Sequence, residues 1–256
     1  MSALRVIAKA GSILLCVVFL AGPLCMVARQ PLCLGDRAAK EWAFHLKKRA
    51  YLSPEPGAHP EAVVQIFAAR AWGLRGLVAE HTWIAVKPHA AECYTIYQVK
   101  GWLYTERRQP PLEIGTGMPD CYWMGARPRV LFDLRGKSAQ QAIARIAAAA
   151  AAYPYQDTYR LWPGPNSNTF TACMVRAVPE LSCDLPVTAI GRDYLPHGQL
   201  VCPTPSHTGY QISLWGLAGI ALGFAEGVEI NLLGLSVKLD FAGRCVELPG
   251  VGRVIG

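Results

Sequence analysis

Short apolar runs with β-branched and aromatic side chains follow one another after residue 60. The runs AVVQIFAARAW (residues 62–72) and RVLFDLRG (129–136) each predict a strand. Between them, EHTWIAVKP (80–88) and ECYTIYQVKGWLY (92–104) flank a short polar turn at residues 88–91. Apolar runs on either side of such a turn predict an antiparallel hairpin.

Two later segments have helical character. SAQQAIARIAAAAAAY (138–153) is dominated by alanine, the strongest helix former, and we expect Ser138 to cap this helix and Pro154 to end it. TFTACMVRAVPEL (169–181) predicts a shorter helix that ends before Pro179. Strands and helices in this arrangement predict an α+β fold, in which an antiparallel sheet carries the packed helices.

The last third of the chain has a different pattern. YQISLWGLAGIALGF (210–224) is apolar, rich in glycine and too short to span a bilayer comfortably. It fits a buried strand and turn, a re-entrant piece or a second membrane contact. EGVEINLLGLSVKLDF (226–241) alternates as strands do, and LPGVGRVIG (248–256) predicts a loop-like tail.

The N-terminus carries the clearest targeting signal. Residues 10–28 are apolar over about the length that crosses a bilayer, and Arg5 and Lys9 precede them. A cleavable signal peptide is the alternative, but small residues stand poorly at the cleavage positions, which favours an uncleaved anchor. We therefore expect a transmembrane anchor or signal peptide at 1–29, a proline-rich linker at 30–61 and one α+β domain at 62–256.

Composition narrows the classes of function. Only 17% of the residues are charged, and the net charge is +7. No basic stripe alternates with aromatic residues, so nucleic-acid binding is not expected, whereas basic residues just after the apolar segment suit a membrane surface. These basic residues favour a cytoplasmic domain, but long domains translocate largely regardless of charge, so the orientation stays open.

The nine cysteines form no CxxC pair, so neither a zinc site nor any other metal or cofactor is expected. Buried thiols are the simplest interpretation. Cys183 and Cys202 flank a loop rich in proline and glycine, and they could pair if the domain lies outside the cytoplasm.

The hairpin offers a candidate base. His81 opens an apolar strand, and a turn centred near residue 89 would place it opposite Gln98. Directly opposed residues share one sheet face, so Gln98 could fix the imidazole as a catalytic base requires. If the two side chains lie on different faces, Tyr97 replaces Gln98 as the candidate. A structural histidine is the alternative.

The candidate nucleophile follows a Pro-Gly-Pro turn. Ser167 stands between Asn166 and Asn168 where the second helix begins, and free N–H groups at a helix N-terminus can stabilise an oxyanion. The alternative is that Asn166 or Ser167 only caps the helix. Cys173 is not an easy substitute, because six residues along a helix it faces about 120° away from Ser167.

EHTWIAVK followed much later by NSNTF resembles the histidine strand and nucleophile helix of circularly permuted papain-fold hydrolases. That group includes NlpC-type cell-wall peptidases and lecithin:retinol acyltransferase. The resemblance covers about residues 79–177 and implies a permuted papain-like fold with His81 as base, Gln98 as third member and Ser167 as nucleophile. Asn166, Asn168 and Trp83 would line the substrate site. Serine stands where those enzymes carry cysteine, and unlike a thiol it cannot ionise beforehand.

A longer set of motifs, VVQIFAARAWG, HTWIAVKP, LWPGPNSNTF, EGVEINLLGL and LPGVGRV, resembles a bacterial family known as a domain of unknown function. We therefore expect a hydrolase or acyltransferase acting on cell-envelope peptide or lipid, or an inactive envelope binding protein on the same scaffold. The expected location is the bacterial inner membrane, with a single span that contacts lipid and a periplasmic domain.

Overall fold

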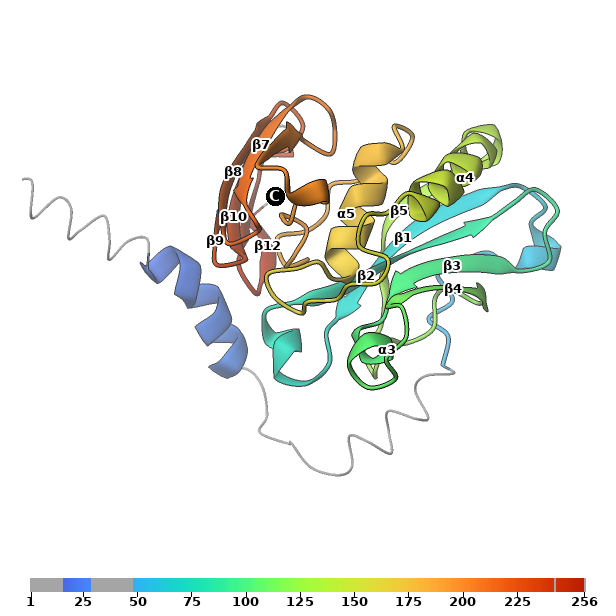
Figure 1. The fold of residues 1–256 in the computed structure, drawn as a ribbon, viewed down its shortest axis with the longest axis horizontal. Helices are drawn as coiled ribbons and strands as arrows, with labels where there is room; N and C mark the ends of the chain where they lie inside the picture. The colour runs from blue at the N-terminus through green and yellow to red at the C-terminus, as the bar shows by residue number, and fades with distance from the viewer. Residues whose placement is uncertain (1–15, 29–47, 242, 256) are drawn as a thin grey trace, which may run out of the picture.

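The computed structural model describes residues 16–28, 48–241 and 243–255. Two antiparallel sheets flank the helices (Figure 1). The first sheet consists of β1 (Val63–Arg70), β2 (Glu80–Lys87), β3 (Tyr94–Val99), β4 (Leu112–Gly117) and β5 (Arg129–Arg135). The second consists of β6 (Val201–Pro203), β7 (Gly209–Leu214), β8 (Ala218–Gly223), β9 (Gly227–Leu232), β10 (Leu235–Asp240), β11 (Cys245–Leu248) and β12 (Gly252–Ile255).

The helices are α3 (Gly101–Thr105), α4 (Gly136–Ala151) and α5 (Ser167–Ala177), with short 3-10 turns η1 (Pro56–Ala58), η2 (Gly73–Leu77) and η3 (Pro196–Gly198). The expected α+β class is confirmed. Ser138 does not cap α4, because the helix already begins at Gly136, whose N–H donates to the carbonyl of Ala62. Residues 101–104, the end of the run predicted as a strand, belong to helix α3, and the tail predicted as a loop (248–256) contains β12 and the last residue of β11.

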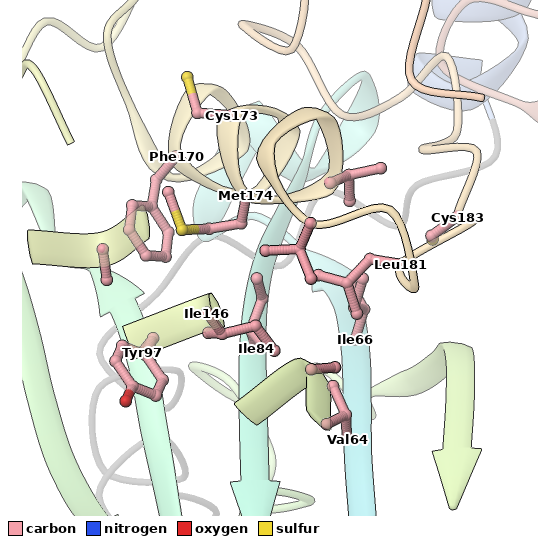
Figure 2. Packing of buried hydrophobic residues seen from close by; sticks show 14 of the residues in the cluster. Val64, Ile66, Ile84, Tyr97, Ile146, Phe170, Cys173, Met174, Leu181 and Cys183 are labelled. Carbon is pink, nitrogen blue, oxygen red and sulfur yellow. The ribbon is translucent and has the colours of Figure 1, made fainter. Parts of the chain in front are cut away.

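The five-stranded sheet has the order β4-β3-β2-β1-β5, and both of its faces are covered. On one face lie α4 and α5. Helix α4 turns Ala139, Ala142, Ile146 and Ala150 to the sheet, at the spacing of one helix face. Figure 2 shows Phe170 and Met174 on the side of α5 that faces the strands, and Leu181 beside Ile66, all within one core cluster.

The other face of this sheet is covered by chain segments without regular structure. Leu52, Met118 and Trp123 pack against Phe67 and Trp83 there. Asp120 joins two of these segments, because its carboxylate accepts hydrogen bonds from the side chain of Arg49 and from the backbone of residues 52 and 53. Residues 48–61 of the expected linker are thus packed on the sheet, and residues 30–47 lie outside the described part.

The seven-stranded sheet runs in the order β12-β11-β10-β9-β8-β7-β6. The segment at 210–224 is a strand, a tight turn and a strand, but one of its faces is exposed and not buried as the strand-and-turn interpretation expected. Its inner face meets α5, where Arg176 donates a hydrogen bond to Gln211. Polar and apolar residues alternate along β7, β9 and β10, and the polar residues point to the inner face.

Residues 16–28 form a helix, and residues 10–15 of the expected anchor lie outside the described part. The helix packs against the turn between β11 and β12, since a side chain at Gly22 would collide with the carbonyl of Pro249. Within the described ranges, no helix is both long and apolar enough to cross a membrane.

Candidate functional site

The N-terminus of α5 is capped by Asn166. Its side-chain oxygen accepts from the backbone N–H groups of Asn168 (2.9 Å) and Thr169 (3.2 Å), and the Thr169 hydroxyl accepts from the backbone N–H of Asn166 (3.0 Å). This reciprocal capping box satisfies donors that the first helical turn leaves free. Ser167 is therefore the first helical residue, and Asn166 is the cap.

Asn168 attaches the helix to the sheet. Its amide nitrogen donates to the carbonyls of Glu80 (2.9 Å) and Ile190 (2.8 Å), and its oxygen accepts from the Thr82 hydroxyl (2.9 Å). Asn166 likewise donates to Ile190. Both amides are buried and fully engaged with protein groups, so neither is free to hold a substrate.

Ser167 lies where the sequence predicts, at the start of the helix that ends at Ala177. Its side chain is buried, and its backbone carbonyl accepts from Thr171 (3.2 Å). Within the described part of the chain, the Ser167 hydroxyl has no hydrogen-bond partner that could remove its proton. Ser167 has the position of a nucleophile, but it lacks the adjacent general base that a serine nucleophile requires.

His81 points away from α5. The next residue, Thr82, reaches Asn168 on the helix side, and successive strand residues point to opposite faces. The imidazole stacks instead on Trp123, with ring centroids 3.8 Å apart, and it also stacks on Trp83 at 5.6 Å. The five-stranded sheet therefore separates the side chains of His81 and Ser167.

The strand register places Gln98 close to His81, although not directly opposite. Ile84 pairs with Tyr97 and Val86 with Thr95, so continuing this register sets Trp83 against Gln98. The predicted direct pairing is thus wrong by two residues, because the turn is longer than assumed. Gln98 still shares the face of His81 and hydrogen-bonds to it.

Tyr97, the alternative to Gln98, lies on the opposite face, in the core beneath α4 and α5. Trp83, expected in the substrate site, is buried, and its indole N–H donates to the carbonyl of Pro119 (3.0 Å). Of the six predicted site residues, the structure brings His81, Gln98 and Trp83 together on one face, and Asn166, Ser167 and Asn168 on the other.

Burial lowers the pKa of His81 to about 3, and the positive charge of Lys100 acts in the same direction, while the hydrogen bond that the imidazole donates to Gln98 opposes both. A neutral imidazole with so low a pKa is a weak base at neutral pH. Its Nε2 atom is buried without a hydrogen-bond partner in the described structure. The surroundings of His81 are those of a packed aromatic side chain.

Cys173 does not replace Ser167. Figure 2 shows it on the side of α5 away from the strands. Burial raises the pKa of its thiol to about 12, so the reactive thiolate is scarce at neutral pH. Cys183 and Cys202 are both free, and no disulfide joins them.

Sequence reasoning missed Glu80, the neighbour of His81. Its carboxylate accepts two hydrogen bonds from Arg129 (2.8 and 3.3 Å) and one from Thr188. Burial raises the pKa of Glu80, but Arg129 and Thr188 outweigh burial and hold it below its usual range. An acidic residue at the start of an apolar strand was the available signal. Through these hydrogen bonds, Glu80 connects β2 to β5 and to the loop before Ile190.

An open hollow of about 560 Å³ lies beside α3. It is lined by Tyr104, Thr105, Arg108, Gln109, Pro110 and Asp157. One arginine, one carboxylate and one aromatic ring suit a polar ligand such as a peptide. The described residues contain no group of three or more His, Cys, Asp or Glu side chains that could hold a metal ion.

Two antiparallel sheets, with α5 between them and α4 on the first sheet, define an α+β protein whose Ser167 and His81 side chains lie on opposite sides of the first sheet. Residues 61–194 match the family described as Protein of unknown function (DUF3750), which covers the five-stranded sheet, α4 and α5. The chain belongs to this family, as its motifs predict. No curated protein and no solved structure matches the chain.

Proposed function

We propose that this protein is a non-catalytic binding protein of the bacterial envelope, held at the inner membrane by its apolar N-terminal segment. One observation carries the proposal. The His81 side chain lies on one face of the five-stranded sheet, and Ser167, on α5, lies over the other face. A serine hydrolase needs its base within hydrogen-bond reach of the nucleophile. Joining them would require β2 to turn over, which would expose a buried strand.

The polar groups of the serine motif also support this proposal. Asn166, Asn168 and Thr169 hold the start of α5 to β2 and to the loop at Ile190 and Gly191. A side chain at Gly191 would collide with Asn166, so the loop and the cap fit closely together. The motif therefore has a structural use that explains its residue types without catalysis.

The hollow beside α3 is the place where we expect a peptide of the envelope to bind. Arg108 and Asp157 supply opposite charges on its wall, and Tyr104 supplies an aromatic surface. Charged peptide termini and side chains suit such a wall. In this proposal the globular part lies in the periplasm, and residues 10–28 anchor it to the membrane.

Labelling with a serine-reactive fluorophosphonate tests the absence of catalysis. We expect equal, background labelling of the wild-type protein and Ser167→Ala. Labelling that Ser167→Ala and His81→Phe both abolish would establish the alternative, a Ser-His hydrolase or acyltransferase. Cosedimentation with purified peptidoglycan then tests binding. Arg108→Ala should weaken it, while Arg145→Ala, an exposed arginine on α4, should not.

A further inference from the structure

The outer face of the seven-stranded sheet is apolar across β6 to β10. The strand register aligns its side chains in rows: Ile212 pairs with Val201 and Ile220, and Ile230 pairs with Ile220 and Val237. A second row contains Tyr210, Leu222, Val228 and Leu239. Ile230 is 45% exposed, and no strand residue in these rows carries a charge.

The inner face of the same strands is polar. Gln211, Glu229, Asn231, Ser236 and Lys238 are buried there, against the loop that carries Asp193. Arg192 from that loop forms an ion pair with Glu229. A sheet that buries its polar face and exposes its apolar face needs a covering, because soluble monomers rarely expose large apolar patches.

A lipid surface suits this face better than a second copy of the chain. With strands about 4.8 Å apart and about 3.3 Å per residue, four strands of six residues and the three-residue β6 give a flat area of roughly 430 Å². Stable protein interfaces commonly bury about 800 Å² on each partner. Aromatic side chains end the patch on both sides, with Phe224 and Phe241 at one end and Trp215 at the other, as at membrane interfaces.

The N-terminal helix (residues 16–28) adds a second apolar surface beside the sheet. Figure 1 shows this helix on the side of the sheet that faces away from α5. Its exposed side chains Val17, Leu20, Leu24 and Val27 repeat at the spacing of one helix face. A bilayer would cover this stripe and the sheet together, and the net charge of +7 favours anionic lipid.

We propose that the outer face of the seven-stranded sheet lies on an anionic lipid surface and forms a membrane contact separate from the N-terminal segment. The sheet rests flat on the bilayer with its strands in the interface, where the open edge at β6 still meets water. The proposal does not rest on the absence of catalysis. It would hold equally for an enzyme on this scaffold.

The test uses the full chain carrying Val17→Arg and Leu20→Arg, which impair the N-terminal contact. This protein should still cosediment with vesicles of phosphatidylcholine and phosphatidylglycerol. Adding Ile230→Glu should lower the partition coefficient about tenfold, and Ile212→Glu about tenfold again, because each removes a lipid-facing side chain. Ile114→Glu, at a 55% exposed position on β4, is the matched control and should change nothing.

Thermal unfolding of each variant checks that it is folded. If the Glu variants do not fold, lipids brominated in the acyl chain give an independent readout, since they should quench Trp215 fluorescence in the parent and less in Trp215→Phe. The proposal is overturned if the parent does not bind vesicles, if Ile230→Glu behaves as Ile114→Glu, if Trp215 is not quenched, or if Ile230→Glu dissociates a dimer seen without lipid.

Discussion

The two sheets distribute polar and apolar side chains in opposite ways. In the five-stranded sheet, apolar residues such as Ile66 and Ile84 are buried beneath α4 and α5. In the seven-stranded sheet, Glu229 and Lys238 are buried, and Ile230 points outward. Both sheets alternate with period two, so the pattern alone identifies strands without deciding which face is inside.

Whether a sheet face is buried or exposed depends on the elements that pack against it. The five-stranded sheet receives apolar α4 and α5, which cover its apolar face. The seven-stranded sheet meets the polar edge of α5 and the charged loop at Arg192 and Asp193, so its polar face turns inward. Burial raises the pKa of Glu229 to about 7, although Arg192 opposes this.

Truncating one isoleucine in each sheet gives the largest contrast. Ile84→Ala should lower the free energy of unfolding by about 4 kcal/mol, because a fully buried side chain leaves a cavity. Ile230→Ala should cost about 1 kcal/mol or less, since its side chain is half exposed. Urea unfolding without lipid measures both. Similar losses for the two variants would mean that Ile230 is covered in solution.

The polar residues at the start of α5 allow a sharper comparison within the first sheet. Asn168→Ala should cost about 3 kcal/mol, because it removes three buried hydrogen bonds, to the carbonyls of Glu80 and Ile190 and from the Thr82 hydroxyl. Ser167→Ala should cost less than about 0.5 kcal/mol, since the hydroxyl bonds to no described group. Chemical unfolding of the two variants measures the loss in the free energy of unfolding for each. The reverse order would contradict the structural interpretation of the motif.

Low pH should reduce the free energy of unfolding, because His81 is buried in its neutral form. Its pKa of about 3 lies below the usual value of 6.5, so the unfolded chain binds this proton first, and stability falls as pH drops through 6.5 toward 3. Between pH 7 and pH 5 the loss should be about 2 kcal/mol. His81→Phe keeps an aromatic ring on Trp123 and should lack this part of the pH dependence. Parallel curves for the two proteins would place His81 in water.

Much of the fold follows from local sequence. Strands β1, β2 and β5, the first hairpin and the end of α5 lie where apolar runs and prolines predict them. Strand β4 falls in a stretch rich in Gly and Pro, where local signals are weak, whereas α3 falls in an apolar run that predicts a strand. Strand β11 pairs with β10, and β12 in the tail pairs with β11; neither pairing can be read from the local sequence.

The candidate site was only partly predictable. The positions of His81 and Ser167 on a strand and at a helix start follow from the sequence. Their separation depends on which face of β2 receives α5, and Thr82 rather than His81 occupies that face. Because adjacent strand residues face opposite ways, a difference of one position decides between a dyad and two unconnected side chains.

The most direct test of this separation is the reactivity of a thiol at position 167. In Ser167→Cys, alkylation by iodoacetamide at neutral pH should be no faster than for an ordinary cysteine of equal exposure, and adding His81→Phe should leave the rate unchanged. The reason is that a thiolate at 167 would have no imidazole beside it. A fast alkylation that His81→Phe abolishes would contradict the account and place the two side chains together.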